Sequence, residues 1–262
     1  MNTNIIMYLI ILIISITMAM VGKGGGNFYV LVMILAGIKM QNAATTSQLI
    51  MMATALTSML IFHKNKKVDW KLALIIDPPT DIMAFVGGYF ASDIHATTLK
   101  IMFASVLILI SIFMFIPVKE KPLSFNNKKG YWNREFNGYI YSVNLWTVLP
   151  LTATVGFFAG AIGISGGAFK IPLMVMLCGI PMEIAIGTSS AMVAATALMG
   201  FIGHSINGDF NPNLAIPLAL VAVCGGLIGS KLALKNKPKN LKKIFAFTNL
   251  LAAIIMIINI LR

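Results

Sequence analysis

The sequence predicts an all-α, polytopic membrane protein. Hydrophobic residues make up 58% of the 262 positions and charged residues only 11%, whereas an ordinary soluble domain carries about 25% charged residues. Apolar runs of about 20 residues, the length that crosses a bilayer as a helix, recur along the whole chain. These runs are continuous rather than alternating, which favours helices over a β-barrel. We therefore expect a multi-pass protein of the cell membrane.

Ten apolar segments can be counted in chain order. In the first half they are 4–21, 28–38, 41–62, 71–91 and 98–118, and in the second half they are 138–162, 168–180, 183–206, 212–234 and 241–261. The only long polar stretch, 119–137, separates the two halves. We predict one repeat over 1–118, a linker over 119–137 and a second repeat over 138–262.

The first and second segments of each half need separate interpretations. The run Ile5 to Met20 has no basic residue before it and no A-x-A-like site after it, so we interpret it as a retained helix rather than a signal peptide. Segments 28–38 and 168–180 are too short for an easy crossing. They are interpreted as half-helices, each paired with the preceding helix in a re-entrant hairpin. This interpretation leaves about 8–10 membrane segments.

The two halves are similar in sequence. With a shift of 142 positions, GIKMQNAATTSQ (37–48) aligns with GIPMEIAIGTSS (179–190), and Gly87 aligns with Gly229. With a shift of 141, GKGGGNF aligns with GISGGAF (163–169). The pattern predicts an internal duplication.

Loop charges predict the orientation of each half. The stretches 63–71, 119–134 and 235–243 are basic, whereas 92–97 and 204–211 carry almost no basic residues. The positive-inside rule places the basic stretches in the cytoplasm. The two halves are then inverted relative to each other, and both termini lie outside. Inverted repeats with short or broken helices at the centre are typical of secondary transporters.

Glycine-rich breaks precede both short segments. The glycines are Gly22, Gly24, Gly25 and Gly26 in the first half and Gly163, Gly166 and Gly167 in the second. Irregular backbone at membrane depth is tolerated where it is buried in protein or lines a cavity, and the helix that follows directs its free N–H groups into the gap. We predict an anion site that includes Gly24, Gly25, Gly26, Gly166 and Gly167. The alternative is close helix packing through small residues.

Two lysines and four hydroxyl residues extend this predicted substrate site. Lys23 and Lys170 lie at or beside the breaks, where a membrane-embedded charge indicates function; the alternative is that their side chains reach out to interfacial water. The aligned pairs Thr46-Ser47 and Thr188-Ser189 are predicted to donate hydrogen bonds to the anion. They could equally bond neighbouring helices.

Asp77 and Asp81 lie one helical turn apart in the fourth segment, beside Pro78 and Pro79. Intramembrane acids mark proton relays or cation sites, so these two are candidates for coupling. The alternative is that the prolines end the helix at the outer surface and leave the acids hydrated.

The remaining polar residues suggest no chemistry. Cys178 and Cys224 lie in apolar runs and do not imply a disulfide, and Glu183 suits a helix N-terminus. His63, His95 and His204 fall at segment ends or in loops and are interpreted as solvated, without metal spacing. No catalytic motif is present, so we expect no enzyme, no metal and no cofactor. The net charge of +12 is assigned to loop orientation rather than to nucleic acid.

The combination of a glycine break, a short apolar segment and G-[LI]-P-x-x-A-x-x-T-S resembles the sulfite exporter TauE/SafE family, also called the 4-toluene sulfonate uptake permeases. The motif is carried by residues 160–190, with a shorter match at 22–47. The resemblance implies secondary transport of small sulfur-containing anions such as sulfite, thiosulfate and organosulfonates.

These observations predict a transporter whose partners are a small anion and the lipid bilayer, with proton or ion coupling as a weaker hypothesis. One alternative is a cation carrier with Asp77 and Asp81 as ligands. A second is a membrane enzyme or scaffold without transport. The exact substrate, the direction of transport and the oligomeric state stay open.

Overall fold

The computed structural model describes residues 3–95, 128–164, 166–208 and 210–237, with short stretches between 97 and 105 and between 239 and 254. The first half contains helices α1 (Thr3–Met20), α2 (Gly26–Leu35), α3 (Met40–Lys64), α4 (Trp70–Ile76) and α5 (Pro78–Phe90), then a 3-10 turn (Ala91–Asp93). Most of the predicted segments 98–118 and 241–261, and residues 119–127 of the predicted linker, lie outside the described residues.

The second half opens with strands β1 (Tyr131–Phe136) and β2 (Tyr139–Asn144). Its helices are α7 (Leu145–Ile162), α8 (Gly167–Pro172) with a π-helical turn (Leu173–Leu177), α9 (Met182–Ile206) and α10 (Pro212–Lys235). The predicted helical membrane fold is confirmed, and each aligned pair of elements has similar bounds. Both half-helix predictions correspond to short helices, α2 and α8.

Two predicted segments differ in detail. Segment 71–91 divides at Asp77 into α4 and α5, because Pro78 and Pro79 occupy the first positions of the new helix and cannot continue the old hydrogen-bond ladder. Segment 138–162 is wrong as a continuous helix, since residues 139–144 pair with β1 in an antiparallel hairpin. Asn137 and Gly138, both with positive φ, form its two-residue turn.

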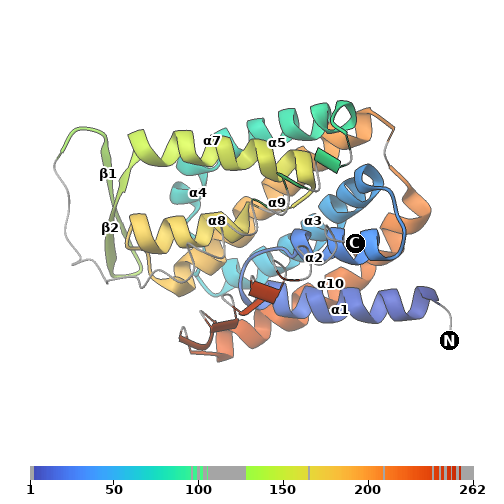
Figure 1. The fold of residues 1–262 in the computed structure, drawn as a ribbon. Coiled ribbons are helices and arrows are strands. Elements are labelled where there is room, and N and C mark those ends of the chain that lie inside the picture. Colours follow the sequence, from blue (N-terminus) through green and yellow to red (C-terminus); the bar gives the residue numbers. More distant parts are fainter. Residues whose placement is uncertain are drawn as a thin grey trace.

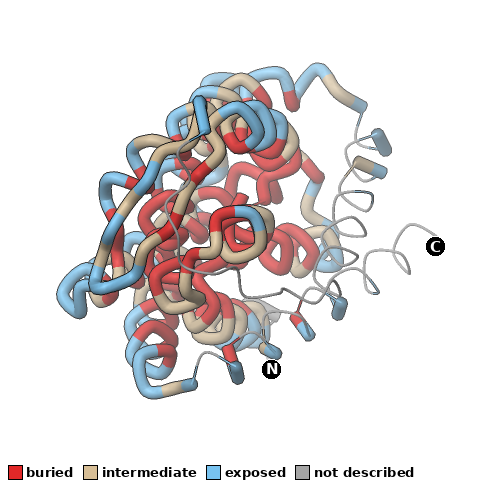
Figure 2. The backbone as a smooth tube through the Cα atoms, turned by 90° about the vertical axis from the view of Figure 1, so that its left-hand side faces the viewer, coloured by how far each residue is buried: buried red, intermediate tan, exposed pale blue. Residues whose placement is uncertain are grey.

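The two halves exchange their fourth elements: the fourth element of each half packs against helices of the other half. Helix α5 of the first half packs along α7 and α9, and α10 of the second half packs along α1 and α3 (Figure 1). Aligned glycines allow both contacts: a Cβ on Gly87 would lie 2.1 Å from the Phe157 carbonyl, and one on Gly229 would lie 2.1 Å from the Ile16 carbonyl. Helices α3 and α9 also pack on each other. Figure 2 shows buried residues gathered in the middle of this bundle.

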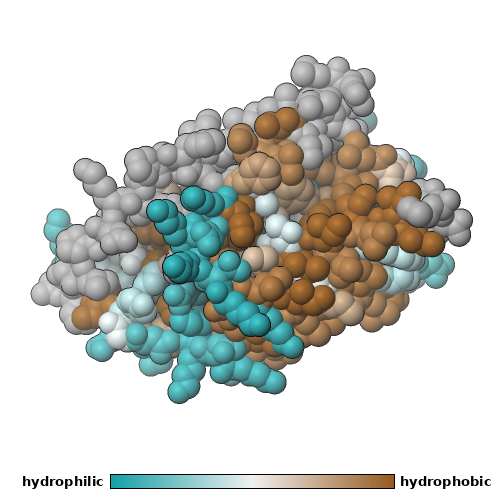
Figure 3. All heavy atoms as spheres, turned by 90° about the horizontal axis from the view of Figure 1, so that it is seen from below, coloured by the Kyte–Doolittle hydropathy of each residue, from teal (hydrophilic) through white to brown (hydrophobic). Residues whose placement is uncertain are grey.

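The outer surface of the bundle is apolar. Ile13, Leu74, Ile82 and Leu220 are each between 63% and 70% exposed, and Figure 3 shows hydrophobic residues over much of one face. Among the described residues, the four helices α3, α7, α9 and α10 are long and apolar enough to cross a membrane. Such a surface is stable against lipid but not against water, so the molecule is a membrane protein.

The basic stretches meet at one end of the bundle. Lys67, after α3, forms an ion pair with Glu183 at the start of α9, and Asn137 of the hairpin donates to the Lys66 carbonyl. At the opposite end, Asn207 donates to the Tyr89 carbonyl. Because α3 ends where α9 begins, these two aligned helices run in opposite directions.

Candidate functional site

The first glycine break is a left-handed turn between α1 and α2. Gly22, Gly24 and Gly25 have φ values of 67°, 73° and 89°, which glycine adopts without the steric cost that a side chain brings. Backbone N–H groups of residues 21–23 fold back on the last turn of α1. Helix α2 then begins at Gly26, so the chain reverses within the protein interior.

The second glycine break likewise lies between the end of one helix and the start of the next, but fewer of its residues have a left-handed backbone conformation. Gly163 caps α7 with a φ of 77°, whereas Gly166 has an ordinary φ of −62°. Gly167 opens α8, and a Cβ there would lie 2.7 Å from Val193 and 3.1 Å from the Lys23 Cα. Position 167 therefore needs glycine because the residue lies close to the first break, and not because of its backbone angles.

Each break packs against the third helix of the other half. A Cβ on Gly22 would lie 2.5 Å from the carbonyl oxygen of Ile186 in α9, and one on Gly163 would lie 2.4 Å from the Cα of Ala44 in α3. Ala44 and Ile186 are aligned by the shift of 142 positions. The two contacts are thus reciprocal, and they bring both breaks to the centre of the bundle.

The aligned serines hold the broken backbone. Ser47 Oγ lies 3.0 Å from the carbonyl oxygens of both Gly26 and Gly163, and Ser189 donates to the Gly22 carbonyl at 2.9 Å. Each serine therefore reaches the break of the other half. Carbonyl groups that a helix would normally pair are satisfied by these hydroxyls.

The aligned threonines differ from each other. The Thr188 hydroxyl accepts a hydrogen bond from the Asp69 backbone N–H at 3.0 Å, so it joins α9 to the start of α4. Thr46 is buried, and its hydroxyl has no hydrogen-bond partner among the described residues. The amide nitrogen of buried Asn27 likewise has none. Both groups lie one residue from the contact between Ser47 and Gly26.

Lys23 is buried in the protein rather than extended to an interface. Its side chain is 0% exposed, and its Nζ donates to the Thr248 hydroxyl at 3.2 Å. A buried ammonium costs several kcal/mol unless a partner or ligand compensates it. The Lys23 side chain therefore does not reach out to interfacial water, and its role in anion binding stays a prediction.

Lys170 is also buried but faces acids. It forms an ion pair with Asp77, at the junction of α4 and α5, and donates to the Thr196 hydroxyl at 2.6 Å. Thr196 in turn donates to Asp81 at 2.7 Å. The alternative that places Asp77 at a hydrated surface is wrong, because Asp77 is only 4% exposed. Asp81 is partly exposed.

The sequence does not predict the burial of His204 or the contacts between the hairpin and Asp69. The solvated interpretation of His204 is wrong: its side chain is 0% exposed and its Nε2 lies 2.9 Å from the Gly160 carbonyl. Buried Asp69 accepts two hydrogen bonds from Arg134, at 3.0 and 3.2 Å, and a third from Tyr141. An Asn-Gly turn signal at 137–138 could have revealed the hairpin, but no sequence signal joins it to Asp69.

The protonation states of Tyr141 and Arg134 maintain the contact between the hairpin and Asp69 at neutral pH. Burial and the hydrogen bond to Asp69 raise the pKa of Tyr141, so its phenol stays protonated and donates. The hydrogen bond to Asp69 also raises the pKa of Arg134, which therefore keeps its charge. The hairpin is fixed to the start of α4 by a two-point contact between a guanidinium and a carboxylate.

Apolar helices that are broken around a buried, charged centre define a membrane transport protein. The family model for the sulfite exporter TauE/SafE matches residues 7–256, and the chain belongs to this family. The sequence resemblance to this family is therefore confirmed.

Known relatives agree with this assignment. The chain is 26% identical over 234 residues to the probable membrane transporter protein YunE of Bacillus subtilis (strain 168), covering 85% of this chain and 86% of YunE. It is 24% identical over 254 residues to the probable membrane transporter protein YdhB of the same organism, covering 95% and 98%. The probable membrane transporter protein MJ0441 of Methanocaldococcus jannaschii is 23% identical over 206 residues, covering 75% and 70%. No solved structure matches the chain significantly.

Proposed function

We propose that the protein is a secondary transporter of small sulfur-containing anions, such as sulfite, thiosulfate or organosulfonates. The observation that carries this proposal is the fully buried side chain of Lys23 in the glycine break before α2. Asn27 follows the same break, and its side-chain amide nitrogen has no hydrogen-bond partner among the described residues. A small oxyanion compensates a buried cation and accepts from such a donor. The family assignment supports the choice of anion.

Helix geometry adds to this proposed site. The N-terminus of α2 follows the first break, and its free N–H groups favour negative charge. Gly24, Gly25 and Gly26 let the backbone approach a ligand closely. Lys23 lies within this break, whereas Lys170 forms an ion pair with Asp77. We therefore assign the anion mainly to the break that holds Lys23, with Ser47 and Ser189 supporting the backbone of the breaks.

Alternating access is the mechanism that this arrangement favours. The reciprocal contacts of Gly22 with Ile186 and of Gly163 with Ala44 are those that an inverted duplication predicts. In such a protein the two halves rock against each other about a central site, which opens first to one side and then to the other. The basic end is assigned to the cytoplasm.

We expect the substitution Lys23→Gln to lower anion affinity by about 10- to 100-fold, because a charge-assisted hydrogen bond contributes about 1.5–3 kcal/mol. Purified protein in liposomes would be tested for sulfite, thiosulfate and ethanesulfonate uptake, with the anion-induced thermal shift as an independent measure of affinity. Lys39→Gln, at an exposed position before α3, is the matched control. If Lys23→Gln behaved like this control in both assays, the assignment of Lys23 would fail.

A second candidate function is proton coupling through the acids. Asp77 forms an ion pair with Lys170. Asp81 is joined to the same lysine through the Thr196 hydroxyl, which contacts both. Two charged carboxylates beside one ammonium leave excess negative charge, which binding of a proton removes at little cost. The protonation state of this cluster would then depend on which side of the membrane it faces.

We expect Asp81→Asn to make transport insensitive to an imposed pH gradient while anion binding persists. Uptake into liposomes with and without the gradient measures the first property, and the thermal shift measures the second. Thr196→Val, which removes the hydroxyl donor to Asp81 without changing charge, is the control. If anion uptake were absent and a cation moved instead, with loss in Asp77→Asn, the cation-carrier alternative would replace the anion proposal.

A further inference from the structure

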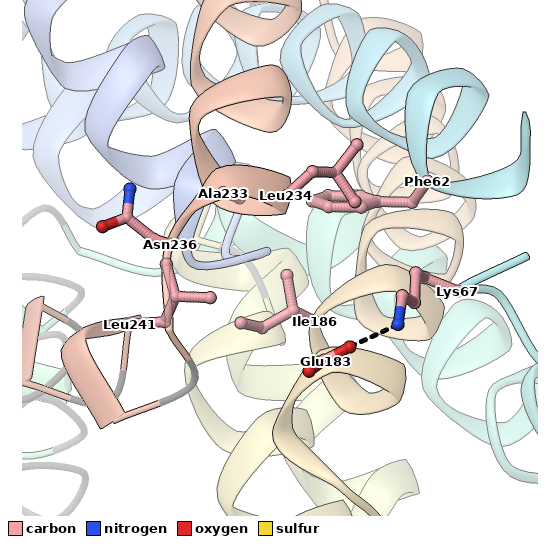
Figure 4. A pocket seen from close by; sticks show the side chains of 8 residues that line it. All are labelled: Phe62, Lys67, Glu183, Ile186, Ala233, Leu234, Asn236 and Leu241. Atoms are coloured by element: carbon pink, nitrogen blue, oxygen red, sulfur yellow. Dashed lines mark hydrogen bonds and ion pairs between the residues drawn. The ribbon is translucent and has the colours of Figure 1, made fainter. Parts of the chain in front are cut away.

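A pocket opens at the basic end of the bundle, away from the central breaks. It lies where three parts of the chain meet: the end of α3 with its following loop, the start of α9, and the end of α10 (Figure 4). Its lining residues include Phe62, Lys67, Glu183, Ile186, Leu234 and Asn236. Its volume is about 100 Å³, room for about three water molecules and therefore for a small oxyanion.

The segments that form this pocket carry many lysines. Lys64, the last residue of α3, and Lys66 in the loop after it are exposed. Lys235, the last residue of α10, is also exposed, as are Lys237, Lys239 and Lys243 after it. Charge of one sign around a concave site raises the local concentration of ions of the opposite sign. This end of the protein therefore attracts small anions.

One ion pair crosses the pocket. Lys67 contacts Glu183 with side chains that are 31% and 39% exposed (Figure 4). Partly exposed pairs exchange readily because water solvates both ions when they separate. An oxyanion that enters the pocket can therefore replace the Glu183 carboxylate on Lys67.

The inner wall of the pocket reaches the central site. Ile186 lines the pocket, and its backbone is also the surface against which Gly22 packs in the first break. One residue thus separates the pocket from the turn that holds Lys23.

We infer that this pocket is the entrance site of the permeation pathway at the basic end, where Lys67 receives the anion in competition with Glu183. The inference rests on the proposed anion transport. It adds a second anion site, outside the breaks, and a carboxylate that regulates access to it.

Transport kinetics from the basic side test the roles of the two charges. We expect Lys67→Gln to raise the KM for sulfite and Glu183→Gln to lower it, each by up to about fivefold, with smaller changes in kcat. Lys39→Gln, at an exposed position at the other end of α3, is the matched control. Unchanged KM values in both pocket variants would overturn the inference.

Labelling tests the pocket without relying on transport. In a Cys224→Ser background, Leu234→Cys in the pocket lining is expected to react with a membrane-impermeant maleimide applied to the basic face. The reaction should be about 10-fold slower once ethanesulfonate, which does not react with maleimides, occupies about nine-tenths of the pockets. The background protein retains Cys178, which is buried, and measures unspecific reaction. Labelling without protection by ethanesulfonate would show an aqueous pocket that is no anion site and would overturn the inference. Protection with no anion uptake would support the pocket while rejecting the proposed transport.

Discussion

Replacing Gly163 by alanine is expected to destabilise the protein by about 2–5 kcal/mol. The new Cβ would lie 2.4 Å from the Cα of Ala44, which is backbone and cannot move aside alone. Overpacking of this kind costs about 1–3 kcal/mol, and the φ of 77° adds about 1–2 kcal/mol of strain for any residue with a side chain. Denaturation of the purified protein in mixed micelles measures the loss.

Gly208 provides a matched control for this prediction. Its φ of 80° is close to that of Gly163, but no atom of the described residues lies within 4 Å of the position where its Cβ would be. Gly208→Ala should therefore cost only the backbone strain, about 1–2 kcal/mol. Equal losses in the two variants would mean that the packing of the second break against α3 does not limit stability.

Replacing Asp69 by alanine is expected to cost about 3 kcal/mol or more and to release the hairpin. Asp69 is the N-cap of α4, where it accepts from the backbone N–H groups of Lys71 and Leu72, and removing such a cap costs about 1 kcal/mol. It is also the buried partner of Arg134, and breaking a buried pair costs about 3–5 kcal/mol when the remaining ion stays buried. The Arg134 side chain is 21% exposed, which favours the lower end of that range.

Two measurements separate the effects of this substitution. The free energy of unfolding reports the total loss, and limited proteolysis near residues 131–144 reports release of the hairpin. Tyr141→Phe removes one hydrogen bond to Asp69 and should cost about 1 kcal/mol. A loss in Asp69→Ala no larger than in Tyr141→Phe would contradict the proposed role of the carboxylate.

The helices and the breaks could be predicted because both depend on residues that are neighbours in the sequence. Continuous apolar runs set the bounds of α1, α3, α9 and α10 to within a few residues. Glycine clusters marked both interruptions. The hairpin was hidden because its strand residues, YIYSV, extend the apolar run that continues into α7.

The polar partnerships could not be predicted, because they join residues of different halves. Lys170 and Asp77 are 93 positions apart by the printed numbering, and sequence position gives no sign that α5 packs on the second half. For the same reason Lys67 and Glu183 were read as separate loop and helix-end charges. The assignment of Thr188 and Ser189 to the anion stays a prediction, although the hydroxyls of both already bond backbone groups.

The exchange of fourth elements constrains how the protein is made. The first half leaves the ribosome with the packing surface of α1 and α3 uncovered, because α10 covers it and is synthesised near the end. Helix α5 likewise meets α7 and α9, its main partners among the described residues, only after they are inserted. Ser15 of α1 lies against Gly225 of α10, so a chain that stops before α10 would leave this face of α1 open to lipid.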